Sequence, residues 1–182
     1  MRLYLLSPFY IEQMKNISMF RLRRSSAVRE WITAVTDRNE QDIEHFRELV
    51  AKGWKGMTAA EQSEWLSGLK GALNRSDLER IESNIQLLSD VLELNLATYA
   101  EGVPELPDET YYANLLRNVS AIREAYCIHV GTPRAPDEPM NTYEKVNDVE
   151  AILLDVYTIL MNNFHYYCGD EIYAGDSFGA LL

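Results

Sequence analysis

Two stretches of this sequence repeat one pattern of apolar and acidic residues, and this repetition constrains the fold more than any other feature. Residues 74–85 align with residues 142–153 without a gap. The matched positions are Leu78 with Val146, Ile81 with Val149, Glu82 with Glu150, Ile85 with Leu153 and, just beyond, Leu88 with Val156. A weaker third copy starts at Thr36. Such repetition predicts a scaffold made by packing similar helical units together.

Capping signals and apolar spacing predict an all-α protein of repeated helical hairpins or a bundle. An N-cap residue followed three positions later by a glutamate occurs at Asp37, Thr58 and Ser76. Apolar residues three and four apart then lie on one face of each helix. The expected helices span residues 37–52, 59–67, 76–98, 109–127 and 142–165.

The repeated pattern also predicts which side chains are buried. Matched apolar positions in the two copies should face their packing partners, which gives Ile81, Ile85, Leu88, Val149, Leu153 and Val156. Only about two heptads are regular, so a bundle is favoured over a coiled coil. The last two expected helices, which a proline-rich loop joins, should pack antiparallel as a hairpin.

Composition changes along the chain divide it into four parts. Prolines at 104 and 107 interrupt helix formation and mark a boundary near residue 102. The predicted parts are a basic N-terminal arm (1–35) that can hold a short strand, a helical subdomain (36–101), a helical hairpin subdomain (102–168) and an aromatic, glycine-rich tail (169–182).

Charge is distributed unevenly along the sequence. The formal net charge is -11, while residues 1–29 hold six basic groups against one acid, so the remainder carries -16. An acidic body disfavours nucleic-acid binding. The arm either docks on an acidic neighbour, including a second copy, or is a solvated basic turn. The tail either pairs with a neighbouring chain or is a frayed terminus. No apolar stretch approaches the roughly 20 residues that cross a bilayer.

The sequence predicts no catalytic, cofactor-binding or metal-binding residues. The nearest approach to a metal site combines Cys127, His129, His165 and Cys168, but the first pair does not share a helix face and the spacing is not that of a zinc site. Buried cysteines and ordinary histidines are the favoured interpretation. His45 is expected on a helix surface. Glu79 and Glu82 are expected on an exposed, solvated helix face.

Four phrases of the sequence resemble those of a known group of proteins. They are Trp31–Arg38, Met57–Leu66, Lys70–Glu82 and Thr142–Val156. In word order they resemble uncharacterised proteins encoded among the tail and baseplate genes of Gram-positive phages and prophages. Two departures stand out: Ala34-Val35 interrupts the first phrase, and residues 1–25 have no counterpart in that group.

This resemblance implies a non-enzymatic virion component. The expected role is an adaptor, baseplate or fibre-attachment subunit of the tail, made in the host cytoplasm, that self-associates and contacts other tail or baseplate proteins. Nucleic acid, membranes and small-molecule substrates are not expected partners. The alternative is a small helical regulatory or protein-binding module that uses its Trp and Tyr surfaces to hold a partner.

Overall fold

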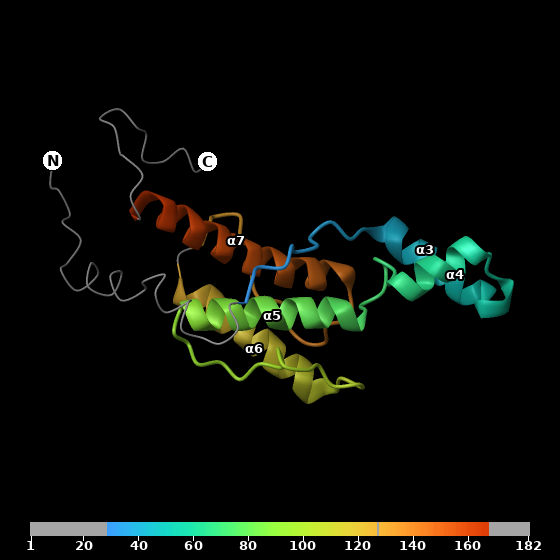
Figure 1. Cartoon of the computed structure of the whole chain (residues 1–182), viewed down its shortest axis with the longest axis horizontal. Coiled ribbons are helices and arrows are strands. Elements are labelled where there is room, and N and C mark those ends of the chain that lie inside the picture. The colour runs from blue at the N-terminus through green and yellow to red at the C-terminus, as the bar shows by residue number, and fades with distance from the viewer. Residues whose placement is uncertain (1–28, 127, 168–182) are drawn as a thin grey trace, which may run out of the picture.

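The computed structural model describes residues 29–126 and 128–167, which are mainly α-helical and contain no strand (Figure 1). The expected all-α fold class is therefore confirmed. The predicted tail and most of the predicted arm lie outside the described residues. The helices are α3 (Glu40–Lys52), the 3-10 helix η1 (Trp54–Gly56), α4 (Ala59–Ser67), α5 (Arg75–Val91), α6 (Glu109–Ala125) and α7 (Tyr143–Tyr167).

One of the three predicted helix starts is confirmed and two are displaced by two residues. Thr58 and Glu61 form the expected capping box before α4. Helix α3 instead begins after Asn39, whose side chain accepts from the Asp42 N–H while the Asp42 carboxylate accepts from the Asn39 N–H. Helix α5 begins after Asn74, whose N–H donates to Asp77. In both α3 and α5, the third helical residue of the capping box is therefore an aspartate, where the prediction had a glutamate.

Helix α5 ends at Val91, so the predicted continuation to residue 98 is wrong. Glu93 has a φ of 56°, a left-handed conformation that breaks the helical hydrogen-bond series. The Leu94 N–H donates to the Ser89 carbonyl at 3.0 Å, and the Glu93 N–H donates to Asp90 at 3.4 Å. These two bonds form a Schellman ending, in which a non-glycine residue occupies the left-handed position.

Helices α5, α6 and α7 share one apolar core. All six residues predicted from the repeat are buried in it: Ile81, Ile85, Leu88, Val149, Leu153 and Val156. Helix α6 contributes Tyr111, Leu115, Val119 and Ile122. One core therefore contains α5, which precedes the boundary predicted near residue 102, together with α6 and α7, which follow it.

The three core helices run in the same direction, so the predicted antiparallel pairing of the last two is wrong. The C-cap residue of α6, Tyr126, accepts a hydrogen bond from Asn163 near the end of α7, at 2.6 Å. Helix α5 likewise places Asp77 and Arg80 beside Glu150 in the first part of α7. Connections of 17 residues, 92–108 and 126–142, can each return along a helix about 25 Å long.

Helices α3 and α4 form a small projection beyond the α5 N-terminal end of this bundle (Figure 1). Their own apolar cluster contains Leu49, Met57 and Leu69, with Phe46 and Trp65 packed against it. Gly53 ends α3 with a φ of 63°, a left-handed conformation that glycine adopts readily. We call this projection the α3–α4 arm (residues 39–69).

Residues 29–38 form what we call the N-terminal strap, which has no regular secondary structure and lies across α5 and α7 (Figure 1). Trp31 stacks on Tyr157 of α7, with ring centroids 4.2 Å apart. At the other end of the strap, Arg38 is buried beside α5 and α7. The strap therefore runs along the surface of the bundle and leads into the α3–α4 arm at its Arg38 end.

Candidate functional site

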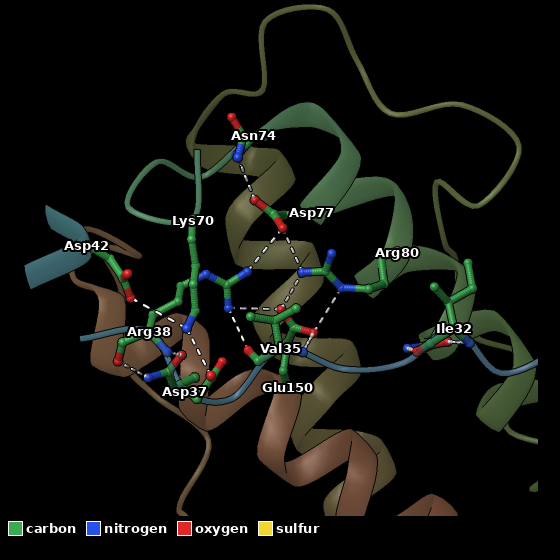
Figure 2. Close-up of polar contacts among 12 residues, drawn as sticks. Ile32, Val35, Asp37, Arg38, Asp42, Lys70, Asn74, Asp77, Arg80 and Glu150 are labelled. Atoms are coloured by element: carbon green, nitrogen blue, oxygen red, sulfur yellow. Dashed lines mark hydrogen bonds and ion pairs between the residues drawn. The ribbon is translucent and has the colours of Figure 1, made fainter. Parts of the chain in front are cut away.

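Two arginines and two carboxylates form a buried cluster of charged side chains in the described part of the chain (Figure 2). Glu150 of α7 is 1% exposed and accepts from Arg38 at 3.0 Å and from Arg80 at 2.7 Å through Oε1. Asp77 Oδ1 accepts from the same two guanidinium groups, at 3.1 and 2.6 Å. We call Arg38, Asp77, Arg80 and Glu150 the four-charge cluster.

Helix α5, helix α7 and the N-terminal strap bring these four residues together. Asp77 and Arg80 lie one turn apart in the first part of α5, so they project on the same side. Glu150 lies four residues after Val146 and three before Leu153, which puts it on the apolar stripe of α7. Arg38 arrives from the strap, immediately before the N-cap of α3.

The four-charge cluster is electrically balanced. Two positive and two negative side chains offset one another, which a buried site requires. Burial by itself would lower the pKa of Arg80, but hydrogen bonds and charge interactions with Glu150 and Asp77 outweigh burial and raise it. The arginine therefore stays protonated throughout the physiological range.

The same cluster holds the backbone of the N-terminal strap. The Val35 N–H donates to Glu150 Oε2 at 2.7 Å, and the Val35 carbonyl accepts from Arg38 at 2.6 Å. Asn147, one turn before Glu150, accepts from the Arg38 N–H at 3.3 Å and donates to its carbonyl at 2.8 Å. Side chains of α7 thus supply the hydrogen bonds that a neighbouring strand would supply in a sheet.

A matching clamp on α5 holds the strap nearer its start. Asn84 is buried, accepts from the Ile32 N–H at 3.0 Å and donates to the Ile32 carbonyl at 2.8 Å. Two asparagines on two helices therefore each bind both backbone groups of one strap residue. This arrangement fixes the register of the strap on the bundle.

A second contact region joins the α3–α4 arm and the strap to the loop before α5 (Figure 2). Lys70 lies 2.9 Å from the Asp37 carboxylate and 3.6 Å from that of Asp42. A Cβ atom on Gly71 would lie 2.0 Å from the Asp42 carbonyl oxygen, so only glycine allows this close approach. The loop before α5 is thereby packed directly onto the first turn of α3.

The carboxylate oxygens of the four-charge cluster have no acceptor capacity to spare. Glu150 Oε1 and Oε2 and Asp77 Oδ1 each accept two bonds within the cluster and strap. Asp77 Oδ2 accepts from the N–H and the side-chain amide of Asn74. A general base needs an accessible acceptor near substrate, which these buried oxygens do not offer. Holding the strap is the role that the geometry supports.

Glu82 occupies the position in α5 that matches Glu150, and it is buried too, so its predicted exposure is wrong. It is 0% exposed, whereas Glu79 is exposed as expected. Glu82 Oε2 accepts from the Tyr99 N–H at 2.9 Å, so this glutamate also holds a segment between helices. Glu82 Oε1 and the Tyr111 hydroxyl are buried without a hydrogen bond of ordinary geometry.

The charge surroundings of Glu82 differ from those of Glu150. Burial raises the pKa of Glu82, and the Tyr99 N–H and the Tyr111 hydroxyl lower it only in part. Burial and the Glu82 charge together raise the pKa of Tyr111. The spacing of Glu82, four residues after Leu78 and three before Ile85, was a sequence signal that it lies on the apolar stripe.

The residues considered for a metal site are only partly described. Cys127 and Cys168 lie outside the described residues, as does the side chain of His165, so their proximity to His129 stays a prediction. Within residues 29–126 and 128–167, no group of three or more His, Cys, Asp or Glu side chains is placed to hold a metal ion. His45 is exposed, as predicted, with Nε2 3.1 Å from Glu64.

Comparison with known proteins gave no relative. Neither a protein-family model nor a curated protein nor a solved structure matches this chain. Among the described helices, none is both long enough and apolar enough to cross a membrane.

Proposed function

We propose that this chain is a non-enzymatic structural protein of a phage or prophage tail, acting as an adaptor, baseplate or fibre-attachment subunit. The observation that carries this proposal is that the residues of the resembling phrases build the strap attachment. Trp31, Ile32 and Arg38 come from the first phrase, Gly71, Asp77 and Arg80 from the third, and Asn147 and Glu150 from the fourth.

This coincidence gives the resemblance a physical content. Residues that are needed to attach a strap and to position the α3–α4 arm specify an architecture, and proteins sharing these phrases would share that architecture. The carboxylate oxygens of the four-charge cluster are saturated by internal hydrogen bonds, which is the chemistry of a rigid connection rather than of turnover. A rigid body with a projecting arm suits a subunit that joins two other components.

The α3–α4 arm provides a surface for such a contact. Three large apolar side chains on it face solvent: Val50 is 52% exposed, Trp54 is 49% exposed and Leu66 is 76% exposed. Aromatic and aliphatic side chains of this kind are frequent anchors in protein interfaces. We propose that another tail or baseplate protein covers them, and that the virion tail is where the protein resides after synthesis in the host cytoplasm.

The alternative function, a small helical regulatory or protein-binding module, is favoured by the same exposed Trp54 and Leu66. Particles purified from the bacterium that carries the gene separate the two. Mass spectrometry should detect the chain in a fixed ratio to tail proteins, and antibody labelling in electron micrographs should mark the tail. A chain that stays in the cell extract while complete particles form would contradict the virion proposal and leave the binding module.

A further inference from the structure

A hollow of about 380 Å³ lies where the N-terminal strap begins on the bundle. Its wall combines the first strap residues with the last turns of α5 and the second half of α7. The lining includes Arg29, Glu30, Trp31, Val91, Tyr157 and Met161. Most of these side chains are apolar, and the hollow is large enough for an aromatic or leucine side chain.

The contacts of the strap define its direction at this hollow. Arg38 lies beside Asp77 in the first turn of α5, Ile32 beside Asn84 in the middle, and Arg29 at the hollow formed by the last turn. Followed backwards from Arg38, the strap therefore heads past the C-terminal end of α5. Arg29, where the described part of the strap begins, therefore lies at the end of the bundle opposite the α3–α4 arm.

The 28 residues that precede Arg29 are suited to burial in such a hollow. They contain twelve large apolar side chains besides Met1 and Val28: Leu3, Tyr4, Leu5, Leu6, Phe9, Tyr10, Ile11, Met14, Ile17, Met19, Phe20 and Leu22. They also carry five basic groups against one acid, a charge of +4, so residues 29–182 carry -15. Apolar burial would hold this segment, and its charge would attract it to an acidic body.

We propose that the hollow receives apolar side chains from residues 1–28 of a second copy of this chain. The exchange is reciprocal, so each copy gives its segment and accepts that of its partner in a closed pair. This inference rests on the proposed function, because it names the self-association surface of the assembly subunit. In this proposal, residues of α5, α7 and the N-terminal strap form the acceptor site for residues 1–28 of the second copy.

Photo-crosslinking of the full chain tests this proposal. Glu30 is exposed at the rim of the hollow, so Glu30→benzoylphenylalanine should not disturb the core. Copies with light and heavy nitrogen are mixed, irradiated and digested. Crosslinks from position 30 into residues 1–28 of differently labelled chains are expected. Crosslinks confined to one chain, crosslinks into residues 168–182, or none at all would each overturn the proposal.

A matched pair of charge substitutions supplies a second test. Met161→Lys puts a charge in the hollow, while Leu66→Lys makes a similar change on the exposed face of α4. Light scattering over a dilution series should show at least a tenfold weaker self-association for the first and no change for the second. Leu5→Ser with Leu6→Ser, which leaves the described residues intact, should weaken it equally. An unchanged association in this last variant contradicts the proposal even if Met161→Lys fails to fold.

These outcomes are separate from the test of the proposed function. If the chain is found in tail particles but stays monomeric in solution and gives no crosslinks between copies, only the proposed exchange is contradicted. If copies exchange residues 1–28 but the chain is absent from particles, only the proposed virion role is contradicted.

Discussion

Glu150 and Glu82 occupy matching positions in the two copies of one sequence pattern, but they solve the problem of a buried carboxylate differently. Glu150 is paired with two arginines and holds Val35 of the N-terminal strap. Glu82 holds Tyr99 by the same kind of bond but has no arginine or lysine among the groups that set its pKa. In both copies of the repeat, the glutamate therefore binds a backbone N–H of a segment outside the helices. The positive charges that pair with Glu150 come from Arg38 and Arg80, outside its own helix.

Removal of the Glu150 charge should have the largest effect. Glu150→Gln leaves Arg38 and Arg80 to share Asp77, so one buried positive charge is uncompensated. We expect the free energy of unfolding in urea to fall by about 3–5 kcal/mol. The same substitution at exposed Glu79, whose partner is Arg75, should change it by less than about 0.5 kcal/mol. Equal small effects at both positions would contradict the account of the cluster.

Loss of the Asn147 clamp should have an intermediate effect. Asn147→Ala removes both bonds to the Arg38 backbone and should cost about 1–3 kcal/mol, because a backbone N–H and carbonyl lose their partners. Limited proteolysis should cut the strap faster in this variant. Asn141→Ala, at an exposed position just before the same helix, provides the control. Unchanged protection of the strap would show that Asn147 is dispensable.

Glu82→Gln should act in the opposite direction to Glu150→Gln. A glutamine can still accept from the Tyr99 N–H, while its amide can donate to the Tyr111 hydroxyl and carries no buried charge. We expect a gain of up to about 1 kcal/mol at neutral pH in the same urea experiment. A loss of more than about 2 kcal/mol would mean that the ionised carboxylate is itself required.

The pH dependence of this difference is the smallest effect and the most specific. Burial raises the pKa of Glu82 above its ordinary value of 4.5, so the folded protein retains this proton at a pH where the unfolded chain has lost it. Its contribution to stability is full below the unfolded pKa and is lost as pH rises through the folded one. The advantage of Glu82→Gln over the parent should therefore grow as pH rises above about 4.5. A constant difference would remove the charge explanation.

The helices and their buried stripes were predictable because the signals for them are local. Spacing of three and four identified Ile81 and Val149, and the Thr58 box marked the start of α4 correctly. The end of α5 was not predictable, since Glu93 carries no glycine-like signal for a left-handed residue. Helix direction was also beyond reach, because caps and periodicity say nothing about the route of a 17-residue connection.

The candidate site was less predictable than the fold. Burial of Glu82 and Glu150 followed from their places on the apolar stripe, and the assignment of Glu82 to an exposed face missed this. The partners were a different matter, because Arg38 and Glu150 are 112 residues apart and no local pattern links them. Residues 29–35 were predicted only as part of a basic arm with a possible short strand. The strap attachment was missed because side chains of α5 and α7, rather than neighbours in sequence, hold its backbone.

Amide hydrogen exchange at two backbone positions tests most directly whether the Glu150 cluster holds the N-terminal strap. The Val35 N–H donates to Glu150 and the Tyr99 N–H donates to Glu82, so each reports on one glutamate. Exchange is measured by NMR under conditions where global unfolding is rare. We predict that Glu150→Gln accelerates exchange at Val35 far more than at Tyr99, and that Glu82→Gln accelerates neither. Equal acceleration at both amides in Glu150→Gln would show a general loss of stability and contradict the strap attachment.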